Sequence, residues 1–159
     1  MISLTKKRDQ KGFTIVELLI VIVVIGILAA LVVTTYSGIQ AKARDSKRKT
    51  DLQALQTQIE AYYAENNAYP SNTNINTVSW RNTNMKSLNV EAMKDPSSSA
   101  ATPTLKNDAT IVVADKQYGY APTTDANGAC EGATDTCTKY TLTAYLEGTK
   151  ATITKNNLD

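Results

Sequence analysis

The chain has 159 residues, of which 42% are hydrophobic and 20% are charged, and its formal net charge is +2. This length supports one modest domain with an appendage rather than two independent cores. The small net charge gives no argument for nucleic-acid binding. The chain contains no histidine, which argues against catalytic triads and most catalytic zinc sites because these need an imidazole. We therefore expect neither an enzyme nor a cofactor or metal site.

The first 33 residues combine a basic leader with a long apolar stretch. Residues 1–12 carry four basic side chains and one acid, Asp9. The stretch from Phe13 to Val33 follows at once, and Glu17 is its only charged residue. At about 1.5 Å per residue, such a helix is about 30 Å long, which is the thickness of the hydrocarbon core of a bilayer. This pattern predicts one transmembrane helix.

Two simpler interpretations of this segment remain open at this point. A secretory signal peptide would place a small-residue cleavage site just beyond a shorter apolar core. The tripeptide Ala41-Lys42-Ala43 has small residues at the required spacing, but it lies past the core in a region of good helix formers. A plain membrane anchor accounts for the apolar run but not for Glu17 within it or for the compact leader that ends at Gly12.

The helix is predicted to continue beyond the apolar stretch to Asn66. Residues 34–38 weaken helix propensity without a proline, and helix formers follow from Ile39. Apolar side chains then recur with helical spacing, which defines one stripe that must be covered; they are Leu52, Leu55, Ile59 and Tyr62. The Asn66-Asn67 pair and Tyr69-Pro70 predict the end of the helix. The alternative is two helices hinged at Ser37-Gly38.

A run of basic residues, here called the basic collar, follows the apolar stretch. Its members are Lys42, Arg44, Lys47, Arg48 and Lys49. From Thr50 onward eight basic residues stand against twelve acidic ones, so the distal part of the chain is acidic. Because positive charge flanks the apolar stretch on both sides, counting charges does not decide its orientation in a membrane. We consider two roles for the collar, contact with acidic neighbours and an ordinary solvated helix face.

The remaining chain predicts a loop region followed by a small antiparallel sheet. Residues 71–107 are rich in Asn, Ser and Thr and predict a loop with one or two short helical turns. Strands are predicted at 110–114, 117–121, 139–146 and 151–155, with 147–149 as a hairpin connection. One face of the sheet can cover the apolar stripe of the helix. The fold class is therefore α+β, with a long N-terminal helix packed on a small C-terminal sheet.

Two cysteines, Cys130 and Cys137, lie downstream of the membrane segment. This position indicates an oxidised, extracytoplasmic domain with one short-range disulfide, the alternative being two buried free thiols. Oxygen ligands for calcium lie nearby at Asp125, Asn127 and Glu131, with Asp135 further on. Their spacing before Gly128 does not match an EF-hand loop, so we predict no metal site.

The stretch KGFTIVELLIVIVVIGILAAL at residues 11–31 resembles the class III signal sequence of type IV pilins and pseudopilins. The stretch ARDSKRKTDLQALQTQIEAYYAENNAYPS and the Lys94-Asp95-Pro96 turn are also similar to this family. The resemblance implies the pilin fold and a division of the chain. Residues 1–12 would be a cytoplasmic leader, 13–33 the transmembrane and filament-core helix, 34–66 an amphipathic helix, 67–109 the αβ-loop, and 110–159 the sheet with its disulfide loop.

The same resemblance implies roles for three N-terminal residues. A prepilin peptidase on the cytoplasmic side would cleave between Gly12 and Phe13, and Phe13 would be N-methylated. An ionised carboxylate in hydrocarbon is costly and needs a partner. The resemblance implies that Glu17 pairs with the α-amino group of Phe13 in a neighbouring subunit. The alternative is that Glu17 snorkels to the membrane interface.

The resemblance implies a filament subunit that begins as a single-pass membrane protein and ends in an extracellular pilus, or fimbrium. Its partners would be further copies of the chain in a helical filament, the prepilin peptidase, the inner-membrane pilus assembly machinery and the membrane. DNA and host or cell surfaces are candidate ligands of the filament. The leading function is a type IV pilus subunit for attachment, twitching motility or DNA uptake. The alternatives are a pseudopilin of a type II secretion or competence system and an unrelated anchored binding domain.

Overall fold

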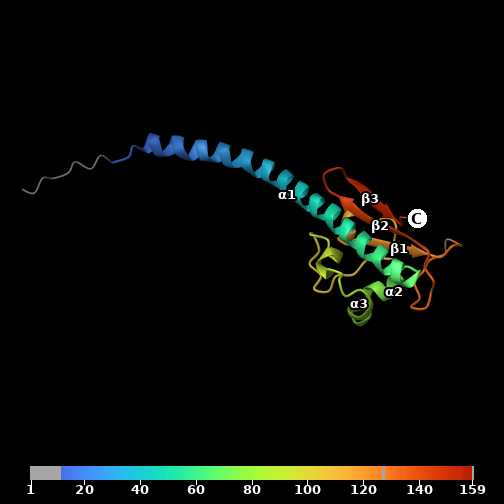
Figure 1. Ribbon diagram of the computed structural model, residues 1–159. Helices are drawn as coiled ribbons and strands as arrows, with labels where there is room; N and C mark the ends of the chain where they lie inside the picture. The colour runs from blue at the N-terminus through green and yellow to red at the C-terminus, as the bar shows by residue number, and fades with distance from the viewer. Residues whose placement is uncertain (1–11, 127, 159) are drawn as a thin grey trace, which may run out of the picture. The chain divides into compact units, whose positions relative to one another are not determined.

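The computed structural model describes residues 12–126 and 128–158 of the chain. Contacts divide the chain into an N-terminal unit that ends at Ile39 and a C-terminal unit that begins at Gln40, and the two are described separately. In chain order the elements are α1 (Ile15–Asn66), α2 (Asn72–Asn76), α3 (Val78–Asn84), η1 (Val90–Met93), η2 (Val113–Asp115), β1 (Gly119–Thr123), β2 (Lys139–Leu146) and β3 (Ala151–Asn156) (Figure 1). The predicted α+β class, with a long N-terminal helix and a small antiparallel sheet, is confirmed.

Helix α1 is continuous through Ser37 and Gly38, so the two-helix alternative is wrong. It begins two residues later than predicted and ends at Asn66 as predicted. Asn67 ends it by taking a left-handed conformation, with φ of 54°, while its N–H donates to the carbonyl of Tyr63 at 2.7 Å. Asparagine tolerates this conformation better than most residues, which is why the pair could be recognised as a stop signal.

The sheet of the C-terminal unit has the strand order β1-β2-β3, and both pairs are antiparallel. Strand β2 has the predicted bounds, β3 is one residue longer than predicted, and β1 lies two residues further along the chain than predicted. Alternation along β2 directs Tyr140, Leu142, Ala144 and Leu146 into the core, where all four are buried. The predicted inward face of this strand is thus confirmed.

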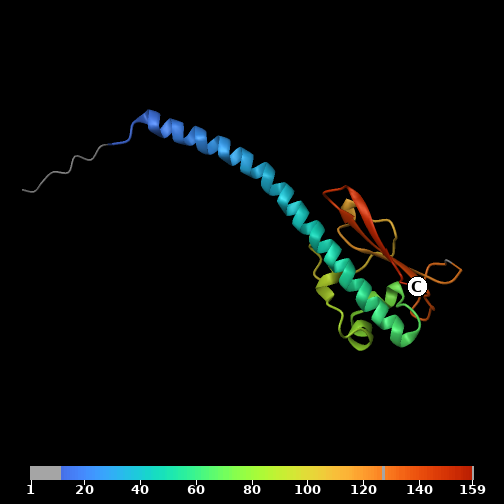
Figure 2. The same cartoon turned by 45° about the horizontal axis from the view of Figure 1, so that its top comes forward.

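The core of the C-terminal unit lies between the second half of α1 and the sheet (Figures 1 and 2). Leu52, Leu55 and Ile59 are fully buried, as their helical spacing predicts, and Tyr62 packs at the edge of the cluster. The loop region adds α2, α3 and η1, whose anchors Ile75 and Met93 are also buried. The region therefore contains more short helical segments than the one or two predicted.

The predicted strand at 110–114 is wrong. This segment forms a loop that leads into η2, and two aspartates hold its backbone. The carboxylate of Asp108 accepts from the N–H of Thr110 at 2.7 Å, and that of Asp115 accepts from the N–H of Val112 at 2.8 Å. Short side chains that bond to nearby backbone compete in this way with strand pairing. As a result Val112 is exposed rather than paired in the sheet.

Candidate functional site

The N-terminal unit exposes its apolar side chains. Phe13 is 90% exposed and Val33 is 68% exposed, and the large apolar side chains between them are exposed as well. This part of α1 is long and apolar enough to cross a membrane, and no part of the described chain covers it. Soluble proteins rarely leave a contiguous apolar surface of this size uncovered. The segment is therefore built to be covered by something other than its own chain.

Glu17 is bound by Thr14 at the start of α1. Its Oε2 accepts from the N–H of Thr14 at 2.8 Å and from the Thr14 hydroxyl at 2.9 Å, while the Thr14 Oγ1 lies 3.2 Å from the N–H of Glu17. This reciprocal pattern is a capping box, and it satisfies backbone donors that the first helical turn leaves free. Thr14 was not among the residues predicted from the sequence, although the spacing T-x-x-E is the usual signal of a capping box.

The remaining predicted residues of this segment are Gly12 and Phe13, which flank the predicted cleavage site. Both are exposed, and nothing lies within 4 Å of the position that a Gly12 side chain would take. Residues 1–11 of the predicted leader lie outside the described residues. Cleavage after Gly12, N-methylation of Phe13 and pairing of Glu17 between subunits stay predictions.

Most of the basic collar binds acids within the C-terminal unit. Arg44 forms a two-point ion pair with Glu147, whose Oε1 is 2.8 Å from the Arg44 Nε. Arg48 is buried and binds three carboxylates, those of Asp45, Asp95 and Glu147. Lys47 pairs with Asp51 four residues later on α1. Arg44 and Arg48 are thus bound within the C-terminal unit and not part of a solvated face. Lys42, Lys47 and Lys49 are exposed, and of these only Lys47 forms an ion pair in the described chain.

This network ties the tip of the β2–β3 hairpin to α1. Asp45 accepts from the backbone N–H groups of Glu147 and Gly148 at 2.9 and 2.8 Å. Burial by itself would raise the pKa of Asp45, but these two N–H groups and Arg48 lower it below its usual value. Hydrogen bonds from Arg44 lower the pKa of Glu147 to about 2, partial burial opposes this shift, and Arg48 adds to it.

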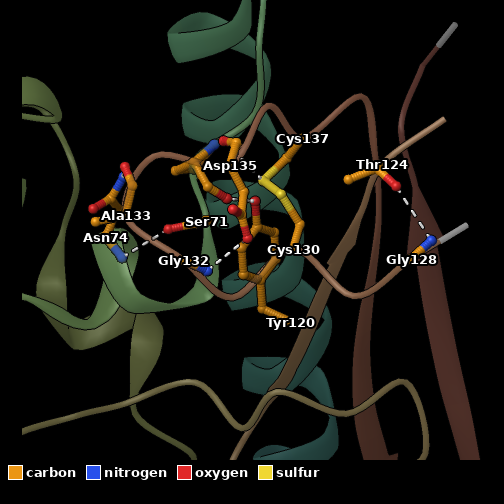
Figure 3. Close-up of a disulfide and its surroundings, with 11 residues drawn as sticks. Ser71, Asn74, Tyr120, Thr124, Gly128, Cys130, Gly132, Ala133, Asp135 and Cys137 are labelled. Carbon is orange, nitrogen blue, oxygen red and sulfur yellow. Dashed lines mark hydrogen bonds between the residues drawn. A yellow bond between two sulfur atoms is a disulfide. The ribbon is translucent and has the colours of Figure 1, made fainter. Parts of the chain in front are cut away.

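The predicted disulfide between Cys130 and Cys137 is present, and both residues are fully buried (Figure 3). The loop that it closes holds the segment after α1. The carbonyl of Cys137 accepts from the N–H of Tyr69 at 2.8 Å, and Asn74 donates from its side chain to the carbonyl of Ala133 at 3.1 Å. The disulfide therefore closes a loop between β1 and β2 whose backbone carbonyls bind the segment after α1, a contact that its position in the sequence alone did not indicate.

The acids considered as calcium ligands do not converge on one point within the described residues. Asp135 accepts from the N–H of Gly132 at 2.7 Å, and Glu131 accepts from Asn107 at 2.6 Å. Asn127 lies outside the described residues. Across residues 12–126 and 128–158, no group of three or more potential ligands could hold a metal ion.

Comparison with known proteins gives a family model and relatives that match part of the chain. A family model described as the prokaryotic N-terminal methylation motif matches residues 7–33. The chain is 44% identical over 66 residues to the type II secretion system core protein G of Aeromonas hydrophila, which covers 42% of this chain and 46% of that relative. The core protein G of Dickeya chrysanthemi is 42% identical over 65 residues, or 41% of this chain and 42% of that relative.

The type IV major pilin protein PilA of Myxococcus xanthus is also similar, with 40% identity over 60 residues that cover 38% of this chain and 27% of that relative. These alignments span less than half the length of each relative. No solved structure matches the chain significantly. The resemblance to type IV pilins and pseudopilins is thus confirmed, and it includes both a secretion-system protein and a major pilin.

Proposed function

We propose that the chain is a membrane-anchored precursor of a filament subunit, trimmed between Gly12 and Phe13 and polymerised through the first half of α1. The observation that carries this proposal is the uncovered apolar surface between Phe13 and Val33. Lipid covers this surface while the subunit waits in the membrane. Helices of other copies cover it when the subunit leaves, because packing many such helices side by side removes the same apolar area from water.

Glu17 favours the transfer of the helix from the membrane into the polymer. In the single chain its carboxylate accepts from Thr14, but these donors are neutral and leave its charge uncompensated in hydrocarbon. Cleavage after Gly12 creates a new α-amino group at Phe13. That cation on an adjacent copy compensates the charge of Glu17, so assembly is favoured over remaining in lipid and only trimmed subunits take part.

A Glu17→Gln variant tests this step. Glutamine keeps an oxygen acceptor for Thr14, so insertion and trimming should be retained, whereas the variant should not form polymer because the charge pair is lost. Conversion of precursor to mature chain is followed by gel mobility, and polymer by shearing and sedimentation. If the variant polymerises as well as the wild type, the proposed role of Glu17 is wrong.

The leading candidate for the filament is a type IV pilus that serves attachment, twitching motility or DNA uptake. A second candidate is the pseudopilus of a type II secretion system, and the similarity to core protein G of Aeromonas hydrophila and Dickeya chrysanthemi favours it. Each of those alignments covers less than half of this chain and less than half of the relative, so the function of the whole relative is a proposal for this chain.

Deletion of the gene separates the two candidates. Loss of long surface fibres in electron micrographs, with secretion of exoproteins intact, supports the pilus. Retention of the fibres with exoproteins trapped in the envelope supports the pseudopilus. Complementation with the wild-type gene and with Glu17→Gln serves as the matched control, because both candidates require that only the wild type restores the lost trait.

A further inference from the structure

A polar groove lies between the second half of α1 and the end of α3 with the segment that follows it. It has a volume of about 280 Å³. On α1 it is lined by Gln58, Ala61, Tyr62 and Glu65, which follow one another at helical spacing along one face. Residues 83–87 form the opposite wall. All of these residues belong to the C-terminal unit, so the groove does not depend on how the two units are placed.

Several polar side chains on other faces of this half of α1 are bound within the C-terminal unit. Asp51, Gln56 and Glu60 point to other faces of the helix, and each forms hydrogen bonds with Tyr118, the Asn156 carbonyl and Tyr140, respectively. In contrast, several groove side chains make no hydrogen bond or ion pair with the described part of the chain; they are Gln58, Tyr62, Glu65, Lys86 and Ser87. Thr83 and Asn84 also line the groove, but their side chains donate to carbonyls of α3. The five other polar side chains are therefore the donors and acceptors that a ligand in the groove can use.

The composition of the lining restricts the class of ligand. One acid, Glu65, and one base, Lys86, leave the groove without net charge, which disfavours polyanions and polycations. Amide, hydroxyl and charged groups disfavour an apolar ligand, because their water shell would be lost without replacement hydrogen bonds. A neutral molecule with many hydroxyl groups can both donate to and accept from this set.

Tyr62 adds a flat apolar surface to these polar groups. Its ring is half-buried and is supported from behind by Trp80, with ring centroids 5.2 Å apart and an interplanar angle of 55°. Burial raises the pKa of the Tyr62 hydroxyl, so it stays protonated and able to donate. The aromatic ring of Tyr62 can pack against the C–H face of a sugar ring. The neighbouring amide and carboxylate groups can form hydrogen bonds with the hydroxyl groups at its edge. The volume is just below the range of about 300–1,000 Å³ for drug-sized ligands, so it fits a short glycan.

We propose that this groove binds a neutral glycan of one or two sugar rings. An open polar groove of this size should bind weakly, with a dissociation constant on the order of 1 mM, equivalent to about 4 kcal/mol. Repetition of the groove along a polymer raises the effective affinity when several sites meet a glycan-covered surface. Binding by one subunit does not rest on the proposed filament function; only this gain through repetition does.

The chain contains a single tryptophan, Trp80, and its contact with Tyr62 makes it a reporter for the groove. The full chain in zwitterionic detergent micelles is titrated with cellobiose, chitobiose, maltose and lactose, while Trp80 fluorescence and saturation-transfer NMR of the sugar are recorded. At least one disaccharide should give a saturable signal with a midpoint in the millimolar range. The double substitution Gln58→Ala/Glu65→Ala should raise that midpoint at least tenfold.

Glu131→Ala in the disulfide loop is the control, because Glu131 is an exposed acid remote from the groove lining. It should leave the midpoint unchanged. The proposal is overturned if none of the four sugars gives a saturable signal by either method at 100 mM, a ceiling about a hundredfold above the expected constant. It is also overturned if the double variant binds as well as the wild type. A wild-type chain that binds sugar but never polymerises would refute the filament function and leave the glycan site standing.

Discussion

Arg48 on α1 and Asp95 after η1 form a buried ion pair in which Nε lies 2.7 Å from Oδ2 and Nη2 lies 3.1 Å from Oδ1. Their side chains are only 4% and 6% exposed. Arg48 also donates to Asp45 at 2.8 Å. The guanidinium of Arg48 thus joins the helix to the loop region through Asp95, which lies 47 positions further along the sequence.

Replacing Arg48 with methionine should destabilise the C-terminal unit by about 3–5 kcal/mol, because Asp95 would remain buried without its cation. Urea unfolding of the full chain in micelles, followed by Trp80 fluorescence, measures the loss. Lys49→Met is the matched control, since Lys49 is exposed, and it should change stability by no more than about 0.5 kcal/mol. Equal effects of the two substitutions would contradict the role given to Arg48.

Acid should weaken the attachment of the hairpin tip to α1. The pKa values of Glu147 and Asp45 are lowered in the folded chain, so both carboxylates hold protons less tightly there than when unfolded. Their contribution to stability is complete above the unfolded pKa, near 4, and is lost as the pH falls from there toward about 2. The melting temperature of wild type and Glu147→Gln should differ at pH 6 and converge at pH 2. A difference that stays constant over this range would contradict the assignment.

Removing the disulfide should cost about 2–3 kcal/mol, since it closes a short loop. Cys130→Ala/Cys137→Ala also loosens the hydrogen bond from Tyr69 to the Cys137 carbonyl, so we expect faster proteolysis near residue 69. Limited proteolysis with mass spectrometry locates the cuts. The oxidised wild type is the reference, and cuts spread evenly over the C-terminal unit would show that the disulfide does not act locally.

Gly119 should tolerate no side chain. A Cβ at this position of β1 would overlap the hydroxyl of Thr143, the carbonyl of Asp108 and the side chain of Ile111. Overpacking of this kind costs about 1–3 kcal/mol. Gly38→Ala is the control, because Gly38 lies in α1 with nothing within 4 Å of the position that a Cβ would take, and alanine favours the helix. The melting temperature should therefore fall for Gly119→Ala and should not fall for Gly38→Ala.

The parts of the fold that could be predicted are those in which a local sequence pattern, such as helical spacing or a cap residue, matches the final structure. Leu52 and Leu55 follow the helical period, Asn67 supplies the left-handed cap, and every second residue of β2 from Tyr140 is buried. The strand predicted at 110–114 failed because Asp108 and Asp115 bind the local backbone, an effect that strand propensity does not include.

The two arginines of the basic collar, Arg44 and Arg48, were misjudged for a different reason. Arg48, Leu52, Leu55 and Ile59 fall on one helical stripe, so the spacing placed Arg48 in the core even though its charge suggested the surface. Its partners Asp95 and Glu147 come from distant segments, and no local pattern indicates them. The polar groove depends in the same way on residues of α1 and on residues 83–87 at and after the end of α3, which only the folded chain brings together.

The most direct measurement is mass spectrometry of the N-terminus of the chain recovered from membranes and from sheared filaments. Trimming and modification should give a mature chain that starts at Phe13 and carries an N-methyl group, in both fractions. A chain that starts at Met1 or Ile2, or one cut after Ala43, would contradict the account that α1 is first a membrane anchor and then the core of a filament.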